Sequence, residues 1–223
     1  MLLKSTQKFL RELYRIGAVK VDAQNGFRLA LHDKDPSAPL SPFYINLRMP
    51  ENKDGPLQPQ HVESIATELM SLAARRHIDY DAIAGIPRAG TPFARRMVAI
   101  SGKTEPKEYV SLRKTSATSR AMRAKERTPG HADRGIRRVL IVDDLITKAD
   151  TKLTAIKAIQ DAGYLVAGIV VYLDREQGGV QELRKMQIPA YAVVRLTEML
   201  DFYGAENLIS AKDLRAINTY LQR

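Results

Sequence analysis

Two adjacent aspartates, Asp143 and Asp144, follow the apolar run "RVLIV" (residues 138–142) and precede the turn "TKADT" (residues 147–151). Carboxylates at the end of a strand can bind a metal ion, accept hydrogen bonds from sugar hydroxyls, or act as a base. A turn that opens a helix suits a phosphate group, because its N–H groups and the helix dipole favour an anion. A ligand carrying both a diol and phosphates would satisfy both parts.

Cationic residues follow three other apolar runs of the chain. They are Arg88 in "PRAG", the pair Arg113 and Lys114, and Arg175 in "DREQGG". Because ligands of open parallel sheets bind beyond the carboxyl ends of the strands, we expect these cations to surround the two aspartates.

The elements that would position these residues follow an α/β pattern. Continuous apolar runs predict parallel strands that are covered on both faces. We expect strands over residues 80–87, 107–113, 138–144, 164–174 and 189–196, alternating with helices over residues 57–77, 90–102, 150–163 and 178–187. The expected fold is a central, mostly parallel sheet flanked by helices.

The N-terminal part differs from this pattern. We expect a helix over residues 4–16, short strands over 18–21 and 26–31 around an Asn-Gly turn, and a strand over 43–48. Residues 1–56 are predicted to form a small hood that the C-terminal helix (211–222) completes, with residues 57–223 as the core.

Composition and charge limit the function classes. The 223 residues include no cysteine, which excludes disulfides, cysteine-based zinc sites and a cysteine nucleophile. The net charge of +10 points to an anionic partner, and residues 113–138 concentrate nine Lys and Arg against two acidic residues. No apolar run is long enough to span a membrane, so we expect a cytoplasmic protein without a membrane partner.

The segment "VLIVDDLITKADT" resembles the phosphoribosyl-pyrophosphate (PRPP) motif of the type I phosphoribosyltransferases. Four further segments are similar, in order, to those of orotate phosphoribosyltransferases: "SPFYINLR" (41–48), "AGIPRAGTPFA" (84–94), "YVSLRK" (109–114) and "LDREQGG" (173–179). The resemblance implies the type I phosphoribosyltransferase fold with an N-terminal hood. It also implies transfer of phosphoribosyl from PRPP to orotate, giving orotidine 5′-monophosphate and pyrophosphate in pyrimidine biosynthesis.

The resemblance also implies roles for residues of this chain. Asp143 and Asp144 would hold the ribose hydroxyls, with Mg²⁺ nearby held mainly through PRPP and no direct metal ligand set in the protein. The 5′-phosphate would lie in the turn made by Thr147, Lys148, Ala149, Asp150 and Thr151. Pyrophosphate would contact Arg88, Ala89, Arg113 and Lys114, and orotate would pair with Arg175.

A mobile catalytic loop, expected at about residues 114–135, would close over the site, commonly in a homodimer with loop exchange. This loop departs from the family pattern, because Ala117 stands where a lysine is usual. The nearest candidates to replace it are Lys125 and His131, of which we select Lys125. An early strand likewise has Ala30 where the family has a ligand-facing lysine, which Arg28 or Lys34 could replace.

The phosphate turn departs from the family pattern as well. Ala149 replaces a glycine, and Asp150 adds a negative charge that would repel a phosphate if it faced it. We expect Asp150 to point outward and to cap the following helix, with Lys148 offsetting its charge.

Two other functions remain open from the sequence. The chain could be a related enzyme acting on another nucleobase, or a non-catalytic paralogue that regulates or binds nucleic acid. We do not expect a nucleic-acid partner, because the sequence has no RNA-binding aromatic signature or helix-turn-helix pattern.

Overall fold

The computed structural model of the chain describes residues 2–33, 35–103, 105–115, 122–124 and 137–222. The chain divides into two compact units, one of residues 1–57 with 196–223, and the other of residues 58–195. In this division the whole segment from residue 196 onward, and not only its last helix, groups with the N-terminal residues.

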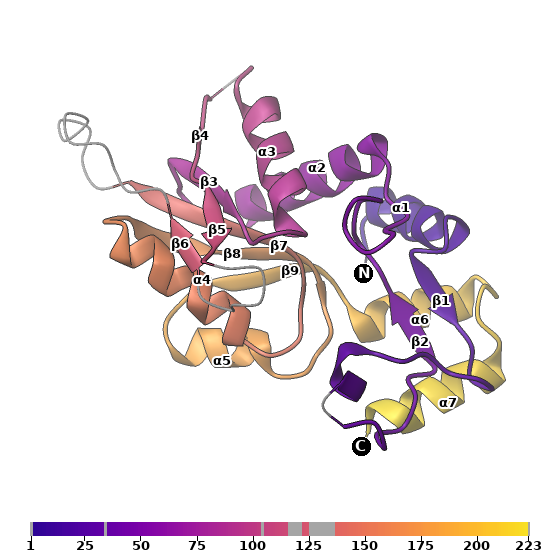
Figure 1. Cartoon of the computed structure of the whole chain (residues 1–223). Helices are drawn as coiled ribbons and strands as arrows, with labels where there is room; N and C mark the ends of the chain where they lie inside the picture. Colours follow the sequence, from indigo (N-terminus) through magenta and orange to yellow (C-terminus); the bar gives the residue numbers. More distant parts are fainter. Residues whose placement is uncertain (1, 34, 104, 116–121, 125–136, 223) are drawn as a thin grey trace. The chain divides into compact units, whose positions relative to one another are not determined.

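The larger unit is built on a five-stranded sheet in the order β4-β3-β7-β8-β9, in which all neighbouring strands are parallel (Figure 1). Its strands are β3 (Ala82–Gly85), β4 (Glu108–Tyr109), β7 (Arg138–Ile146), β8 (Leu165–Asp174) and β9 (Ala190–Arg195). The longest pairing joins β7 to β8, from Arg138 opposite Leu165 to Ile146 opposite Asp174. The predicted α/β class and its parallel sheet are confirmed.

Helices cover both faces of this sheet. The helices α2 (Pro59–Arg75) and α3 (Gly90–Ser101) lie over one face, and α4 (Asp150–Asp161) and α5 (Gly179–Lys185) over the other (Figure 1). On the α4 side, Val139 and Ile141 of β7 share a buried core with Ile156 and Ile159 of α4. The alternating residues of β7 that face the other side are also fully buried, which explains why this strand is apolar without interruption.

The smaller unit contains α1 (Lys4–Arg15), β1 (Val19–Val21), the 3₁₀ turn η1 (Ala30–Asp33), β2 (Phe43–Ile45), α6 (Leu196–Ala205) and α7 (Ala211–Leu221). The buried face of α1 includes Phe9, Leu10 and Leu13. The hydroxyl of Tyr203 on α6 donates a hydrogen bond to the carbonyl of Leu10 at 2.9 Å, which ties α6 to α1. None of the described helices is long and apolar enough to cross a membrane.

The predicted strand over residues 26–31 is wrong. The Asn-Gly turn does form, with Gly26 at φ +67°, and Asp22 accepts the N–H of Asn25 at 2.8 Å. Instead of pairing back on β1, however, the chain makes only an isolated bridge between Phe27 and Ser41 before η1. The antiparallel partner of β1 is β2, which lies more than twenty residues further along the chain.

The predicted single strand over residues 107–113 is also wrong, because the chain changes sheet within it. β4 pairs with β3, and the N–H of Val110 still donates to the carbonyl of Ile83 at 2.9 Å. The next residues leave this sheet and form β5 (Leu112–Lys114), which makes a separate antiparallel pair with β6 (Met122–Ala124).

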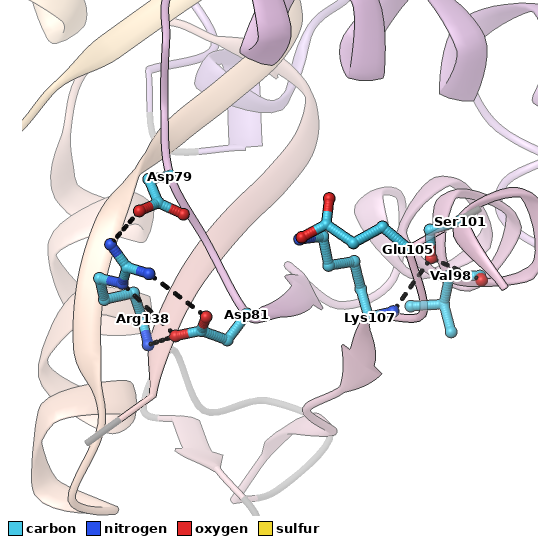
Figure 2. A network of polar contacts seen from close by, with 7 residues as sticks. All are labelled: Asp79, Asp81, Val98, Ser101, Glu105, Lys107 and Arg138. Atoms are coloured by element: carbon cyan, nitrogen blue, oxygen red, sulfur yellow. Dashed lines mark hydrogen bonds and ion pairs between the residues drawn. The ribbon is translucent and has the colours of Figure 1, made fainter. Parts of the chain in front are cut away.

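A polar network joins the starts of β3 and β7 at the edge of the sheet opposite the strand ends (Figure 2). The backbone N–H of Arg138 donates to Asp81 Oδ2 at 2.9 Å, and its guanidinium bonds Asp81 and the more exposed Asp79. Nearby, Ser101 Oγ donates to the carbonyl of Val98 and accepts the N–H of Lys107. The bonds from Arg138, its backbone N–H first, hold the pKa of the Asp81 carboxyl below its usual value.

The lowered pKa of Asp81 predicts a pH-dependent contribution to stability. A carboxyl whose pKa is depressed in the folded state stabilises the fold above its unfolded pKa of about 4, and this contribution is lost as the pH falls through the folded pKa. Asp81→Asn should therefore unfold at lower urea concentration than the parent at pH 7, and the difference should shrink on acidification. Asp79→Asn, which removes a carboxylate with 73% of its side chain exposed, should have a smaller effect. Equal midpoints for Asp81→Asn and the parent at pH 7 would contradict this assignment.

Candidate functional site

The carboxyl ends of β3, β7 and β8 lie at one edge of the parallel sheet, where ligands of such sheets bind. The loop after β3 is held against β7, because the N–H of Ile86 donates to the carbonyl of Val142 at 2.9 Å. A Cβ on Gly90, the first residue of α3, would lie 2.2 Å from that carbonyl oxygen and 3.0 Å from the Cα of Asp143. Only glycine permits this approach, so the loop carrying Arg88 and Ala89 is placed beside the acid pair. Arg88 is exposed there, and the Pro87–Arg88 peptide bond is cis.

The acid pair belongs to β7 itself, which continues to Ile146. Asp143 and Asp144 are each 5% exposed. Asp143 Oδ1 accepts the N–H of Asp144 at 3.0 Å, and Asp144 Oδ1 accepts the N–H of Leu145 at 2.8 Å. Each carboxylate therefore bonds the backbone of the residue after it, which fixes both side chains close to the strand.

Lys152 is a residue of this site that the sequence analysis missed. It is 5% exposed, and its Nζ donates to Asp143 Oδ2 at 2.7 Å and to the carbonyl of Leu145 at 2.6 Å. A signal was available in the sequence. Lys152, Ala155, Ile156 and Ile159 follow the i, i+3, i+4, i+7 spacing of a buried helix face, which places this lysine among apolar residues.

The turn after the acid pair leads directly into α4. Ala149 is the N-cap of this helix and is fully buried, whereas Lys148 and Asp150 are exposed. The expectation that Asp150 caps the helix is therefore wrong. Asp150 is the first helical residue, and no side chain caps this end. The N–H groups of a first helical turn have no partner within the helix, so this turn offers donors to an anion.

The start of α5 closes the site on the β8 side. The N–H of Gly179 donates to the carbonyl of Thr147 at 2.9 Å, and a Cβ on Gly179 would lie 2.6 Å from that oxygen. Arg175 follows β8, and its N–H donates to the carbonyl of Ile146 at 2.9 Å. Its side chain is half-buried. The structure thus gathers the Arg88 loop, the acid pair, the turn of residues 147–151 and Arg175 at three adjacent strand ends.

Arg113 and Lys114 lie on a different element, the β5–β6 hairpin. They line a cleft of about 690 Å³ whose other described lining residues are Ser111, Thr115, Arg123 and Ala124. Arg123, which the sequence analysis did not select, is paired with Arg113 across the hairpin. The described lining contains three cations, no carboxylate, and neither member of the acid pair.

Several predicted features lie outside the described residues. They are Lys125, Ala117, Lys34 and most of the predicted mobile loop, of which the structure describes only residues 114, 115 and 122–124. Within the described ranges, no group of three or more His, Asp or Glu side chains is arranged to hold a metal ion.

The neighbouring Asp174 predicts a second pH-dependent effect on stability. It is 4% exposed, and this burial raises the pKa of its carboxyl above the usual value, although Oδ1 accepts the N–H of Glu176 at 2.8 Å. A raised folded pKa gives stability that is complete below the unfolded pKa of about 4 and is lost as the pH rises through the folded pKa.

Asp174→Asn keeps the acceptor oxygen and removes the charge. We expect its free energy of unfolding to exceed that of the parent at pH 7, with the two converging as the pH falls toward 4. Glu182→Gln, at an exposed position of α5, serves as the control and should change little. A less stable Asp174→Asn protein at pH 7 would show that the carboxylate is favourable where it lies.

Comparison with known proteins agrees with this geometry. Residues 54–188 match the Phosphoribosyl transferase domain family. The chain is 31% identical over 186 residues to a curated orotate phosphoribosyltransferase of Pyrobaculum islandicum, covering 81% of this chain and 86% of the relative. It is 28% identical to the orotate phosphoribosyltransferase of Sulfurisphaera tokodaii, covering 83% and 87% of the two chains.

Solved structures share the fold. The UMP synthase of Leishmania donovani superposes with a TM-score of 0.71 at 25% identity, covering 97% of this chain, which spans only 41% of that one. The orotate phosphoribosyltransferase of Francisella tularensis superposes with a TM-score of 0.69 at 16% identity, covering 99% and 97% of the two chains, and so shows the shared fold. From its matched domain and its curated relatives, the chain belongs to the phosphoribosyl transferase domain family, among the orotate phosphoribosyltransferases.

Proposed function

We propose that this chain transfers the phosphoribosyl group of PRPP to orotate, giving orotidine 5′-monophosphate and pyrophosphate. One observation carries the proposal. Two buried carboxylates, Asp143 and Asp144, lie near the end of the parallel strand β7, which leads through a short turn into an open helix start. They lie beside a loop that Gly90 allows to approach them. This arrangement matches a ligand with a diol and a phosphate, in a chain of the orotate phosphoribosyltransferase family.

The ribose 5-phosphate part of PRPP would bind across the end of β7 and the start of α4. Its 2′- and 3′-hydroxyls would donate to the acid pair, because ionised carboxylates only accept hydrogen bonds. Its 5′-phosphate would accept bonds from backbone N–H groups of residues 147–151, where the helix dipole also favours an anion. Lys148, which is exposed, adds a positive charge near this phosphate, whereas the exposed Asp150 can remain in solvent.

The pyrophosphate is the leaving group, and cations near it would lower the barrier. The bond between C1 of the ribose and a pyrophosphate oxygen breaks with its electron pair on the pyrophosphate, and a ring nitrogen of orotate bonds to C1 and loses its proton. Negative charge therefore grows on the leaving oxygens, where preorganised donors stabilise the transition state. Arg88 and the amides around Ala89 are the candidates at the β3 end, and Arg113 and Lys114 those on the hairpin.

Magnesium fits this site as a companion of the substrate. Mg²⁺ is usually bound by one or two carboxylates together with substrate phosphates, and not by a cage of protein ligands. Asp143 and Asp144 supply two carboxylates, and Lys152 already bonds one of them. When bound, the ion would neutralise charge on the pyrophosphate. We propose Mg-PRPP as the substrate form, with the acid pair near the ion.

Arg175 is the candidate for orotate recognition. A guanidinium forms two parallel hydrogen bonds with a carboxylate, which gives both affinity and orientation. The backbone of Arg175 is fixed to β7 through Ile146, next to the phosphate turn. We also propose that the active form is a homodimer, in which the loop of about residues 114–135 from one subunit completes the site of the other.

The direct test is turnover of orotate and Mg-PRPP by the purified chain, followed by the loss of orotate absorbance. Asp144→Asn should lower kcat/KM by about 10- to 100-fold, because it removes a charge-assisted hydrogen bond to the sugar. Asp161→Asn, an exposed carboxylate at the end of α4, should not. Turnover of another nucleobase but not of orotate would move the chain to a sister activity, and no turnover of any base would overturn the proposal.

Arg175→Ala tests whether Arg175 is the residue that binds the carboxylate of orotate. We expect the KM for orotate to rise by about tenfold or more, since a bidentate charged pair is lost, while the KM for PRPP changes little. Arg175→Lys should recover only part of the loss, because an ammonium cannot reproduce the fork. Arg75→Ala, on an exposed part of α2, is the matched control. An Arg175→Ala enzyme with an unchanged KM for orotate would place the carboxylate elsewhere.

A further inference from the structure

Lys152 is a buried cation at a position where a positive charge is unfavourable. It is 5% exposed and lies in the first turn of α4. Burial penalises an ammonium, and the positive end of the helix dipole adds to this penalty. A lysine is retained there only where its partners compensate, and two partners do so. Nζ lies 2.7 Å from Asp143 Oδ2 and 2.6 Å from the carbonyl oxygen of Leu145.

These two bonds bracket Asp144. One goes to the residue before it and the other to the residue after it. The bracket is closed by Asp143 Oδ1, which accepts the N–H of Asp144 at 3.0 Å. Residues 143–145 are therefore held to the helix start at both ends, by the same ammonium group.

The bracket also connects two parts of the site that come from different elements. Asp143 shares the face of β7 that carries Val139 and Ile141, and this face packs against α4. The proposed diol site belongs to β7, and the proposed phosphate site belongs to the turn that starts α4. Lys152 is a side-chain link between them, and its bonds fix their spacing.

We propose that Lys152 is a positioning residue, acting through Asp143, that holds the acid pair at the spacing from the phosphate turn that bound PRPP requires. This inference rests on the proposed function, because it assigns the site to PRPP. It does not depend on which nucleobase accepts the sugar. Lys152 touches no reacting atom. Its effect on binding is transmitted by the carboxylate that it holds.

The test uses three variants of the full chain: Lys152→Met, Asp143→Asn and the double variant. Lys157→Met is the matched control, since Lys157 lies on the same helix but pairs with Asp161 in solvent, with 77% of its side chain exposed. The dissociation constant of Mg-PRPP is measured by calorimetry without any base, and melting temperatures are recorded in parallel. We expect Lys152→Met to weaken binding by about tenfold or more, as for loss of a charge-assisted hydrogen bond, and Lys157→Met to leave it unchanged.

The double variant separates positioning from a general effect. If Lys152 acts through Asp143, then adding Lys152→Met to Asp143→Asn should change the dissociation constant by less than about threefold, since the ion pair with Asp143 is already lost. The proposal would be overturned if Lys152→Met raised the dissociation constant by the same factor in the parent and in the Asp143→Asn variant. It would also be overturned by a Lys152→Met protein that melts earlier but binds Mg-PRPP as the parent does, because this is the behaviour of a purely structural lysine.

Two further outcomes are distinguishable. Lys152→Met alone leaves a buried carboxylate unpaired and can fail to fold, whereas the double variant removes both charges. In that case the dissociation constants of Asp143→Asn and the double variant still test whether Lys152 acts through Asp143. A parent that binds Mg-PRPP but does not convert orotate removes only the choice of base and leaves this inference standing. A parent that does not bind Mg-PRPP overturns the proposed function and this inference with it.

Discussion

An ionised carboxylate inside a protein is stable only where donors or cations replace the water that it has lost. Asp143, which is 5% exposed, meets this requirement with one backbone N–H and one ammonium. These two bonds constrain the elements around Asp143. The strand must run on to Ile146 so that Leu145 can offer its carbonyl, and α4 must begin close enough for Lys152 to reach both groups. The shape of the strand end is thus set by the need to bury charge.

The parallel sheet supplies the second condition. Its neighbouring strands end at one edge, so loops that are distant in sequence meet there. Hydrogen bonds from Ile86 to Val142, from Arg175 to Ile146 and from Gly179 to Thr147 tie the segments after β3 and β8 to β7 and to the turn that follows it. These are backbone bonds, which do not depend on side-chain identity. The scaffold can therefore keep its geometry while the side chains of Arg88, Lys148 and Arg175, which are the proposed ligand contacts, vary.

The sequence predicted the parts of the fold whose signals are local and strong. The apolar runs of β7 and β8 and the helices between strands are correct because burial on both faces leaves an uninterrupted pattern. The pairing of β1 with β2 could not be predicted from local pattern, because it depends on a contact across the η1 segment. Helix α6 (Leu196–Ala205) was missed because it follows β9 without a break, and its apolar residues extend the pattern of that strand.

The site was predictable to a similar degree. The acid pair, the phosphate turn and Arg175 stand out because charged residues after apolar runs are conspicuous. Lys152 was not selected, since a lysine in a helix is usually exposed. Its spacing with the buried residues of α4 indicates burial, and the tertiary contact with Asp143 identifies its partner. The capping role given to Asp150 failed for a related reason. Residue preference favours aspartate as a cap, but the chain enters the helix one residue earlier, at Ala149.

Gly90 has an implication for how this protein can change. A single added carbon at this position would overlap the Val142 carbonyl, with 2.2 Å between the two atoms. No side chain of any kind fits unless α3 moves away from β7. The nineteen alternatives at position 90 are thus equivalent in their first effect, which is to separate the Arg88 loop from the acid pair. The distance between these two parts of the proposed binding site depends on the absence of a Cβ at position 90. Substitutions that change this site must therefore occur at other positions and keep Gly90.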